Sequence, residues 1–362
     1  MLPTFYDVGP VRVSPNVVLA PMEGVTDLTF RRLIRQIGGV GLTCTEFIAS
    51  GGLKADGGKM YEMAQTDPDE RPVSIQLYGK DPAQMAEAAR IVQGLGATIC
   101  DVNMGCPSKK VCSNSGGSAL MREPALARDI VRAVVAAVDI PVTVKMRSGF
   151  DAGLRNAPEL AWICQEEGAQ AVAIHWRTRE DRYGGQRRVD KIAEAKARLR
   201  VPVLANGDIV DVASAEAMFR ETGCDGVLVG RGAIRNPWLL KQISQWLAGE
   251  PPVVVDAAER RRVMLAYLAG IRAMFRSDHG ALGRYKMLAG YYTRQLPQGR
   301  VLKQLILHSH AVPEAIEHTE AYFARLVRHE GGEADAFEGY AAPEYVRAPK
   351  ARGAGRVAAV PG

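Results

Sequence analysis

Two short stretches decide the fold of this chain: residues 201–208 read VPVLANGD, and residues 226–232 read GVLVGRG. Each is an unbroken apolar run that ends in polar residues, which is typical of a strand buried on both faces of a parallel sheet. The same pattern occurs six more times earlier in the chain. The expected strands are Val17–Met22, Leu42–Ile48, Val73–Tyr78, Ile99–Asn103, Val142–Met146, Ala171–His175, Val201–Asn206 and Gly226–Val229.

Helical sequence follows each of these runs. Pro82–Leu95 and Pro124–Val138 have proline in the first turn, and Gly94, Gly168 and Gly223 are good helix stops. Eight strand–helix units in about 245 residues predict an α/β fold, the (β/α)8 TIM barrel. The competing fold, a doubly wound open sheet, would favour a GxGxxG turn after the first strand, whereas residues 20–27 read APMEGVTD.

The pattern changes at Pro251-Pro252, and only helical sequence follows. Four helices are expected, at Ala257–Phe275, Ala281–Gln295, Val301–Ser309 and Pro313–His329. From residue 331 onward, 18 of the last 32 residues are Gly, Ala or Pro, which predicts disorder. We therefore expect a barrel over residues 1–248, a small helical bundle over 251–330 and a disordered tail over 331–362.

The net charge of +6 is concentrated in one segment. Residues 251–330 hold twelve Lys and Arg against seven acidic residues, whereas residues 1–250 hold 30 basic and 29 acidic residues. A basic segment beside a neutral one suggests contact with a polyanion. A solvated, arginine-rich helical surface would give the same pattern.

The six cysteines are scattered singly, without a CxxC pair, so we expect neither a zinc ribbon nor any other metal site. This usage is natural in a reducing compartment. The N-terminus lacks a basic flank before an apolar run, and no apolar run approaches the ~18 residues of a membrane span. We expect a cytoplasmic protein without a membrane partner.

Active sites of barrels lie at the carboxyl ends of the strands, so the polar residues that end each run form the candidate site. Their convergence is the strongest signal in the sequence, because partly buried polar groups need partners. They are Pro21, Met22 and Glu23; Gln76; Asn103 and Cys106; Lys145 and Arg147; His175 and Arg177; Asn206, Gly207 and Asp208; and Gly230 and Arg231.

The last two groups suggest a phosphate site, because barrels often bind phosphate with glycine N–H groups after their last two strands. Tight turns would use the same glycines. Gln76 and Asn103 are amides, which suit the donor and acceptor edge of a flavin or a pyrimidine. Lys145 and His175 fit an anionic or electron-rich ring, although a Schiff-base lysine and a structural histidine are alternatives.

Cys106 is the candidate reactive residue. A cysteine at a strand end can act as a nucleophile or as a proton donor. Lys109 and Lys110 raise the local positive potential, which favours the thiolate or modulates the acidity of the thiol. A packed small side chain is the alternative interpretation, and it suits Cys100 and Cys164 better.

Several motifs resemble those of the tRNA-dihydrouridine synthases, in the same order from about residue 15 to residue 240. They are residues 20–27 (APMEGVTD), 76–79 (QLYG), 101–107 (DVNMGCP), 145–149 (KMRSG), 206–209 (NGDI) and Gly230-Arg231. Residues 103–110 (NMGCPSKK), followed by 117–120 (GSAL), are most similar to the bacterial B-type branch.

The resemblance implies a barrel that carries FMN, reduced by NADPH or NADH, and a C-terminal helical bundle that contacts tRNA. It implies that Cys106 is the general acid and that Asn103 faces the flavin ring and the substrate uracil. We also expect Arg147, Arg177, Arg284 and Lys286 to contact the substrate. The residues that it assigns to the flavin are Pro21, Met22, Glu23, Gln76, Lys145, His175, Asn206, Gly207, Asp208, Gly230 and Arg231.

Two positions depart from the family pattern: Trp176 replaces a small residue, and Lys286-Met287 replaces a basic–histidine pair. Two other functions stay open at this point. A flavin enzyme for a free pyrimidine, of the dihydroorotate dehydrogenase kind, would act on free uracil or orotate and would not need the basic segment. A non-catalytic RNA-binding protein would be free of flavin and colourless.

Overall fold

The computed structural model describes residues 2–54, 57–112, 116–182, 184–275, 277–294 and 296–342. The chain divides into two compact units, residues 1–253 and 254–362. This division lies beside the Pro251-Pro252 break in the sequence pattern. The functions that the sequence assigns to the two parts stay predictions.

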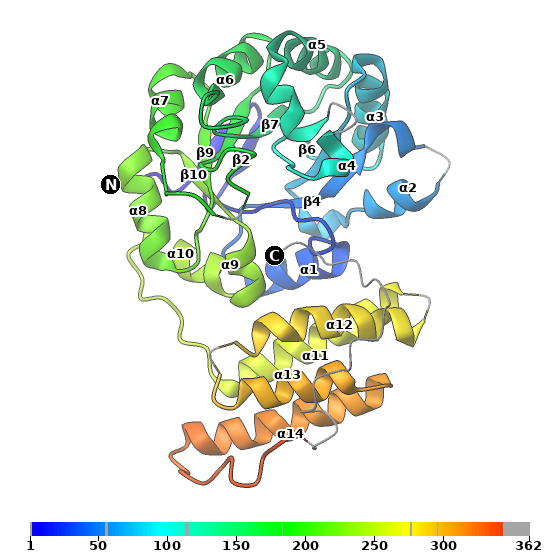
Figure 1. Ribbon diagram of the computed structural model, residues 1–362, viewed down its shortest axis with the longest axis vertical. Coiled ribbons are helices and arrows are strands. Elements are labelled where there is room, and N and C mark those ends of the chain that lie inside the picture. The colour runs from blue at the N-terminus through cyan, green and yellow to red at the C-terminus, as the bar shows by residue number, and fades with distance from the viewer. Residues whose placement is uncertain are drawn as a thin grey trace. The chain divides into compact units, whose positions relative to one another are not determined.

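Eight parallel strands close into a barrel in the first unit (Figure 1), and β10 pairs with β3 to complete the ring. The predicted TIM barrel is confirmed, because every expected run overlaps one of these strands. Both faces of each strand are covered by protein, which explains the unbroken apolar runs. The strands are β3 (Val17–Leu19), β4 (Leu42–Ala49), β5 (Val73–Tyr78), β6 (Ile99–Met104), β7 (Val142–Arg147), β8 (Ala171–His175), β9 (Val203–Asn206) and β10 (Gly226–Val229).

Helices surround the barrel (Figure 1), and local sequence signals set where they begin. The carboxylate of Asp81 accepts a hydrogen bond from the amide of Gln84 at the start of α3, which also has proline in its first turn. The longer helices are α1 (Leu28–Ile37), α3 (Pro82–Gly94), α5 (Pro124–Val135), α6 (Ala157–Glu166), α7 (Asp190–Arg198), α8 (Val212–Thr222) and α10 (Leu239–Leu247). The short ones are α2 (Lys59–Met63), α4 (Lys109–Cys112), α9 (Arg231–Arg235) and three 3-10 turns at Ser50–Gly52, Pro68–Glu70 and Gly117–Arg122.

A hairpin that the sequence analysis missed precedes the barrel. Strands β1 (Tyr6–Val8) and β2 (Val11–Val13) pair in antiparallel fashion. Its side chains Tyr6, Val8 and Val13 join one buried cluster with residues from the beginnings of the barrel strands, such as Leu42 and Ile99. The hairpin therefore covers the amino ends of the strands and leaves the carboxyl ends for the site.

The second unit contains the four expected helices in its described part: α11 (Ala257–Met274), α12 (Asp278–Tyr292), α13 (Gly299–His308) and α14 (Val312–Glu330). The expected end of the second helix, Gln295, lies outside the described residues. Val263, Tyr267 and Ile271 share one buried face of α11, as their spacing predicts. The Tyr285 hydroxyl lies 2.8 Å from Thr319 Oγ1 and connects α12 to α14.

The first part of the expected disordered tail is ordered. Residues 331–342 form turns, and the rings of Phe337 and Tyr340 lie 5.6 and 5.9 Å from the ring of Tyr322 on α14. The backbone of Ala336 accepts a hydrogen bond from Arg325. A few aromatic contacts outweigh the Gly- and Ala-rich composition here. Residues 343–362 of that tail lie outside the described residues.

The loop that follows β3 is held by a buried ion pair. The guanidinium of Arg31 donates to both carboxylate oxygens of Glu70, at 3.0 and 2.9 Å, and both side chains are at most 1% exposed. The same guanidinium donates to the backbone oxygens of Thr26 and Gln65. These bonds connect α1, the end of the β3 loop and the segment before β5.

We expect Glu70→Gln to lower the free energy of unfolding by about 3–5 kcal/mol, because it leaves the Arg31 charge buried without a counter-charge. Urea denaturation followed by circular dichroism measures the change. The exposed pair Arg132–Glu167 is the matched control, since E167Q breaks a bidentate pair at the surface. Its unfolding midpoint should hardly move. Equal midpoint shifts for the two variants would contradict the prediction.

Candidate active site

The register of the barrel brings the predicted site residues together at the carboxyl ends of the strands. Asn103 on β6 lies opposite Lys145 on β7. Arg147 on β7 lies opposite His175 on β8, which in turn lies opposite Asn206 on β9. Residues from distant parts of the sequence therefore form one continuous rim.

A chain of buried hydrogen bonds connects three neighbouring strands, β5, β6 and β7. Thr143 Oγ1 and Gln76 Nε2 donate to the two carboxylate oxygens of Asp101, at 2.6 and 2.5 Å. Asn103 Nδ2 donates to Gln76 Oε1 at 2.7 Å. Asp101 was not among the sequence-predicted site residues, although an acid inside a buried apolar run is a signal in itself.

Cys106 lies at the end of this chain. Its backbone N–H donates to Asn103 Oδ1 at 2.9 Å, and its carbonyl oxygen accepts from Ser118 Oγ. Burial, with Glu23 and Cys112 nearby, raises the pKa of the Cys106 thiol to about 11, although a backbone hydrogen bond from Ser108 opposes this shift. The thiol therefore carries its proton at neutral pH. Among the described groups, desolvation has the largest effect on this thiol. The side chains of Lys109 and Lys110 lie outside the described residues, so their expected effect on the acidity of the thiol stays a prediction.

Burial also shifts the basic groups of the rim toward their neutral forms. The pKa of Lys145 falls to about 8 through burial and the neighbouring Arg147, while Asp101 opposes the change. Burial, with Arg147 and Lys145 nearby, holds the pKa of His175 well below its usual value. His175 Nδ1 accepts a hydrogen bond from the backbone N–H of Arg177 at 3.1 Å, so the neutral ring carries its proton on Nε2.

Two arginines of the rim hold backbone loops in place. Arg147 donates to the carbonyl oxygens of Gly105 and Thr178, both at 2.8 Å. Arg177 donates to both carboxylate oxygens of Asp208, at 2.9 and 2.7 Å, and its guanidinium lies 4.0 Å from the ring centre of Trp176. Both arginines are buried, so these bonds position loops. Their expected contacts with substrate stay predictions.

The loops after β9 and β10 have the features of a phosphate cradle. Arg231 also donates to Asp208, at 3.0 Å, and Asn206 Nδ2 donates to the carbonyl of Leu228 at 2.8 Å. Gly207 has a φ of +117°, and a Cβ there would lie 2.5 Å from the Trp176 ring, so only glycine fits. Gly230 precedes α9, whose first N–H groups have no acceptor within the helix. These residues fit an anionic phosphate.

The loop after β3 lies beside the loop after β10. A Cβ on Gly230 would be 3.7 Å from Met22 Sδ, which is ordinary contact. The backbone N–H of Gly24 donates to Glu46 on β4, and the amide of Met22 bonds to Thr26 Oγ1 at 3.1 Å. Pro21 and Met22 are half-buried, and Glu23 is exposed. The expected flavin residues from these two loops are therefore close to one another.

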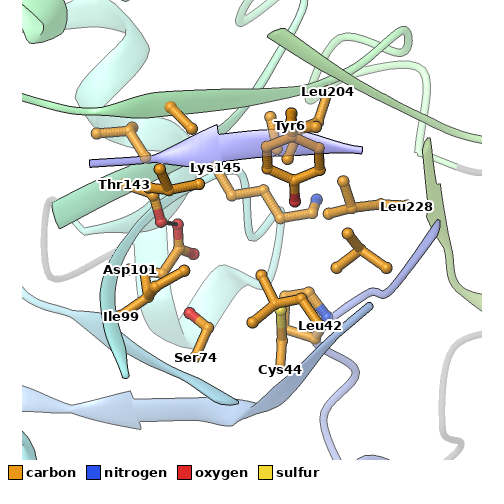
Figure 2. Close-up of a pocket in the computed structure, with 16 residues that line it drawn as sticks. Tyr6, Leu42, Cys44, Ser74, Ile99, Asp101, Thr143, Lys145, Leu204 and Leu228 are labelled. Atoms are coloured by element: carbon orange, nitrogen blue, oxygen red, sulfur yellow. Dashed lines mark hydrogen bonds between the residues drawn. The ribbon is translucent and has the colours of Figure 1, made fainter. Parts of the chain in front are cut away.

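Below the rim lies a cavity of about 30 Å³, enough for one water molecule. Figure 2 shows Tyr6, Asp101, Thr143 and Lys145 around this one internal space. The Tyr6 hydroxyl comes from the N-terminal hairpin and has no hydrogen-bond partner within the described chain. Polar groups thus continue from the rim into the interior of the barrel.

Two predicted site residues lie elsewhere. Arg284 and Lys286 are half-buried on α12 of the second unit. Across the described ranges, no cluster of three or more His, Cys, Asp and Glu side chains is arranged to hold a metal ion. None of the helices in those ranges combines the length and apolar character needed to cross a bilayer.

The family model described as "Dihydrouridine synthase (Dus)" matches residues 18–327. The chain belongs to the dihydrouridine synthase family. It is 39% identical over 320 residues to tRNA-dihydrouridine synthase B of Pseudomonas syringae pv. tomato, covering 88% of this chain and 92% of the relative. The tRNA-dihydrouridine synthase B of Xanthomonas axonopodis pv. citri is 38% identical, with coverage of 88% and 96%.

Among solved structures, a histamine dehydrogenase from Rhizobium sp. shares the fold, with a TM-score of 0.51 and 14% identity over 74% of this chain and 50% of that one. The predicted B-type branch of the dihydrouridine synthases is confirmed by the relatives. The prediction of an enzyme from an oxidoreductase family is confirmed as well. The roles of single residues in this dihydrouridine synthase stay predictions.

We expect alkylation of Cys106 by iodoacetamide to be slow at pH 7 and to rise about tenfold per pH unit until pH 10, because only the thiolate reacts. Trypsin cuts after Lys109 or Lys110 and separates Cys106 from Cys112, so tandem mass spectrometry can follow each residue. In urea, the same residue should titrate near its ordinary value of about 8.5. A plateau below pH 9 in the folded protein would contradict the raised pKa.

Proposed function

We propose that this protein reduces the C5=C6 bond of specific uridines in tRNA to 5,6-dihydrouridine, with FMN as cofactor and Cys106 as general acid. The observation that carries the proposal is the protonated thiol of Cys106, held at the barrel rim in a member of this family. The reductant would be NADPH or NADH. All six cysteines are free thiols, which suits the expected cytoplasmic location.

Two sets of residues at the rim support the proposal that the protein binds FMN. The cradle of Asn206, Gly207, Gly230 and Arg231 would hold the phosphate, with Asp208 fixing Arg231. The ring would lie among the residues that the family resemblance assigns to it. They are Pro21, Met22, Glu23, Gln76, Lys145 and His175. Reduced FMN, when bound, would supply the hydride that adds to C6 of the uracil.

The chain's own residues would manage the proton and the position of the base. The Cys106 thiol would transfer its proton to C5, and the resulting thiolate would recover a proton from solvent. Because its pKa is about 11, the thiol is protonated before each turnover. Asn103 would contact the uracil, which must leave its stack in the RNA to reach the rim.

The second unit would supply contacts to RNA phosphates. Some of its positive charge is already paired inside the unit, since Arg261, Arg262, Arg272 and Arg328 bind Glu320, Glu259, Asp278 and Glu333. Arg284 and Lys286 lie on α12 of this unit, and the sequence predicts that they contact the substrate.

We expect Cys106→Ala to retain FMN and NADPH oxidation but to reduce tRNA 10²–10⁴-fold more slowly, as is typical when a positioned general acid is lost. Mass spectrometry of tRNA nucleosides measures the dihydrouridine formed, and chromatography identifies the released flavin. Cys112→Ser is the matched control, because its side chain bonds only to the Cys106 carbonyl and Ser118 in the described structure.

Wild-type protein without flavin, or reduction of free uridine but not of tRNA, would refute the proposed function. A C106A variant that forms dihydrouridine at the normal rate would refute the role of Cys106 alone. These outcomes separate the cofactor, the substrate and the proton donor.

The double variant R284Q/K286Q should bind tRNA more weakly, and its dependence on salt should be less steep. Each lost phosphate contact lowers the log–log salt slope by about 0.7–0.9. R262Q/R272Q removes two arginines that are paired within the unit and should leave the slope nearly unchanged. Salt titration of tRNA binding measures both slopes, and circular dichroism checks that the helices persist. Identical slopes for the two variants would place tRNA recognition outside α12.

A further inference from the structure

The hydrogen-bond chain at the rim ends in a group that can only accept hydrogen bonds and, at the other side, in groups that can only donate them. At one end, the Asp101 carboxylate accepts from Thr143 and Gln76. At the other end, the backbone N–H groups of Gly105 and Cys106 donate to Asn103 Oδ1, at 3.0 and 2.9 Å. An ionised carboxylate can only accept, and a backbone N–H can only donate.

The two amides between these ends can satisfy both only in one orientation. Gln76 must present its NH₂ group to Asp101, and its oxygen then accepts from Asn103. Asn103 must present its oxygen to the backbone of Gly105 and Cys106. Reversing either amide would place two donors or two acceptors against each other.

The N–H groups and lone pairs of Gln76 and Asn103 that the chain does not use determine what this pair can offer to a ligand. Both lone pairs of Asn103 Oδ1 are used, so its only free group is one N–H. Gln76 retains one N–H and one lone pair. The pair therefore has two unused N–H groups and one unused lone pair, and it suits the carbonyl oxygens of a flavin or a uracil better than their ring N–H groups.

We propose that Asp101 is a positioning residue of this enzyme: its carboxylate holds Gln76 and Asn103 as N–H donors toward carbonyl oxygens and, through them, fixes the backbone of the Cys106 loop. The part that concerns ligands rests on the proposed function. The part that concerns the loop depends only on the hydrogen bonds within the chain.

The surroundings of Asp101 support this role. Its side chain is buried beside the internal cavity, where an apolar residue would cost less free energy. Burial raises the pKa of the Asp101 carboxyl, and the hydrogen bonds from Thr143 and Gln76, with Lys145 nearby, oppose this shift and favour the charged form. Removing Asp101 would leave the Gln76 amide unpaired in a buried position, and its orientation would no longer be set from below.

The test compares Asp101→Leu, Asp101→Asn and Thr143→Val. Leucine removes both bonds. Asparagine keeps the shape and can accept from Gln76 while its NH₂ group donates to Thr143, so it should rescue part of the effect. Valine at 143 removes one bond to the same carboxylate without touching Gln76, which makes it the matched control.

In the free enzyme, we expect hydrogen exchange of the segment containing Gly105 and Cys106 to be on the order of tenfold faster in D101L, slightly faster in D101N and unchanged in T143V. Alkylation of Cys106 at fixed pH should follow the same order. These readouts need neither flavin nor tRNA. If D101L does not fold, the comparison of D101N with T143V tests the same point, with a smaller expected difference in the exchange and alkylation rates.

In the loaded enzyme, kcat for tRNA reduction should fall roughly ten- to a hundredfold in D101L with KM for tRNA within twofold of wild type, and D101N should lie between them. The proposal would be overturned if, in D101L, hydrogen exchange of the Cys106 segment and alkylation of Cys106 were as slow as in the wild type. Changed exchange together with a wild type inactive on tRNA would instead refute the proposed function and retain Asp101 as the anchor of the loop.

Discussion

Closure of the barrel between β10 and β3 is the constraint on which the rest of the structure depends. Because all eight strands run in parallel, closure gathers their carboxyl ends at one rim, while the β1–β2 hairpin packs against their other ends. The polar residues that end the strands therefore lie together at this rim. Many of them bond to one another there: Asn103 bonds to Gln76, and Arg177 and Arg231 bond to Asp208.

Burial at this rim shifts the titratable groups toward their neutral forms. The pKa of the Cys106 thiol rises to about 11, that of Lys145 falls to about 8, and that of His175 falls well below its usual value. The same physical cause acts on acid and base, because a buried charge loses hydration. The Cys106 thiol therefore keeps its proton at neutral pH, which suits proton donation better than nucleophilic attack.

The sequence predicts the strands well because an unbroken apolar run is a local pattern, and it predicts the rim because barrel geometry is general. An acid inside a buried run singles out Asp101, but the sequence does not reveal its partners, since the Gln76 and Thr143 side chains lie on two other strands. It misses the hairpin because three-residue strands have too little periodicity to detect. It also does not show how strongly burial raises the pKa of the Cys106 thiol, because desolvation depends on the packed structure around the residue.

The departure at Trp176 becomes intelligible in the same terms. Its ring is 1% exposed and packs against Gly207, where any Cβ would collide with it. The Arg177 guanidinium covers the ring at 4.0 Å and also grips Asp208. Trp176, in the loop after β8, therefore packs tightly against the loop after β9. A small residue there would leave space beside Gly207, so in this chain the bulky ring itself shapes one side of the loops proposed to hold phosphate, and Arg177, bound to Asp208, packs against the ring.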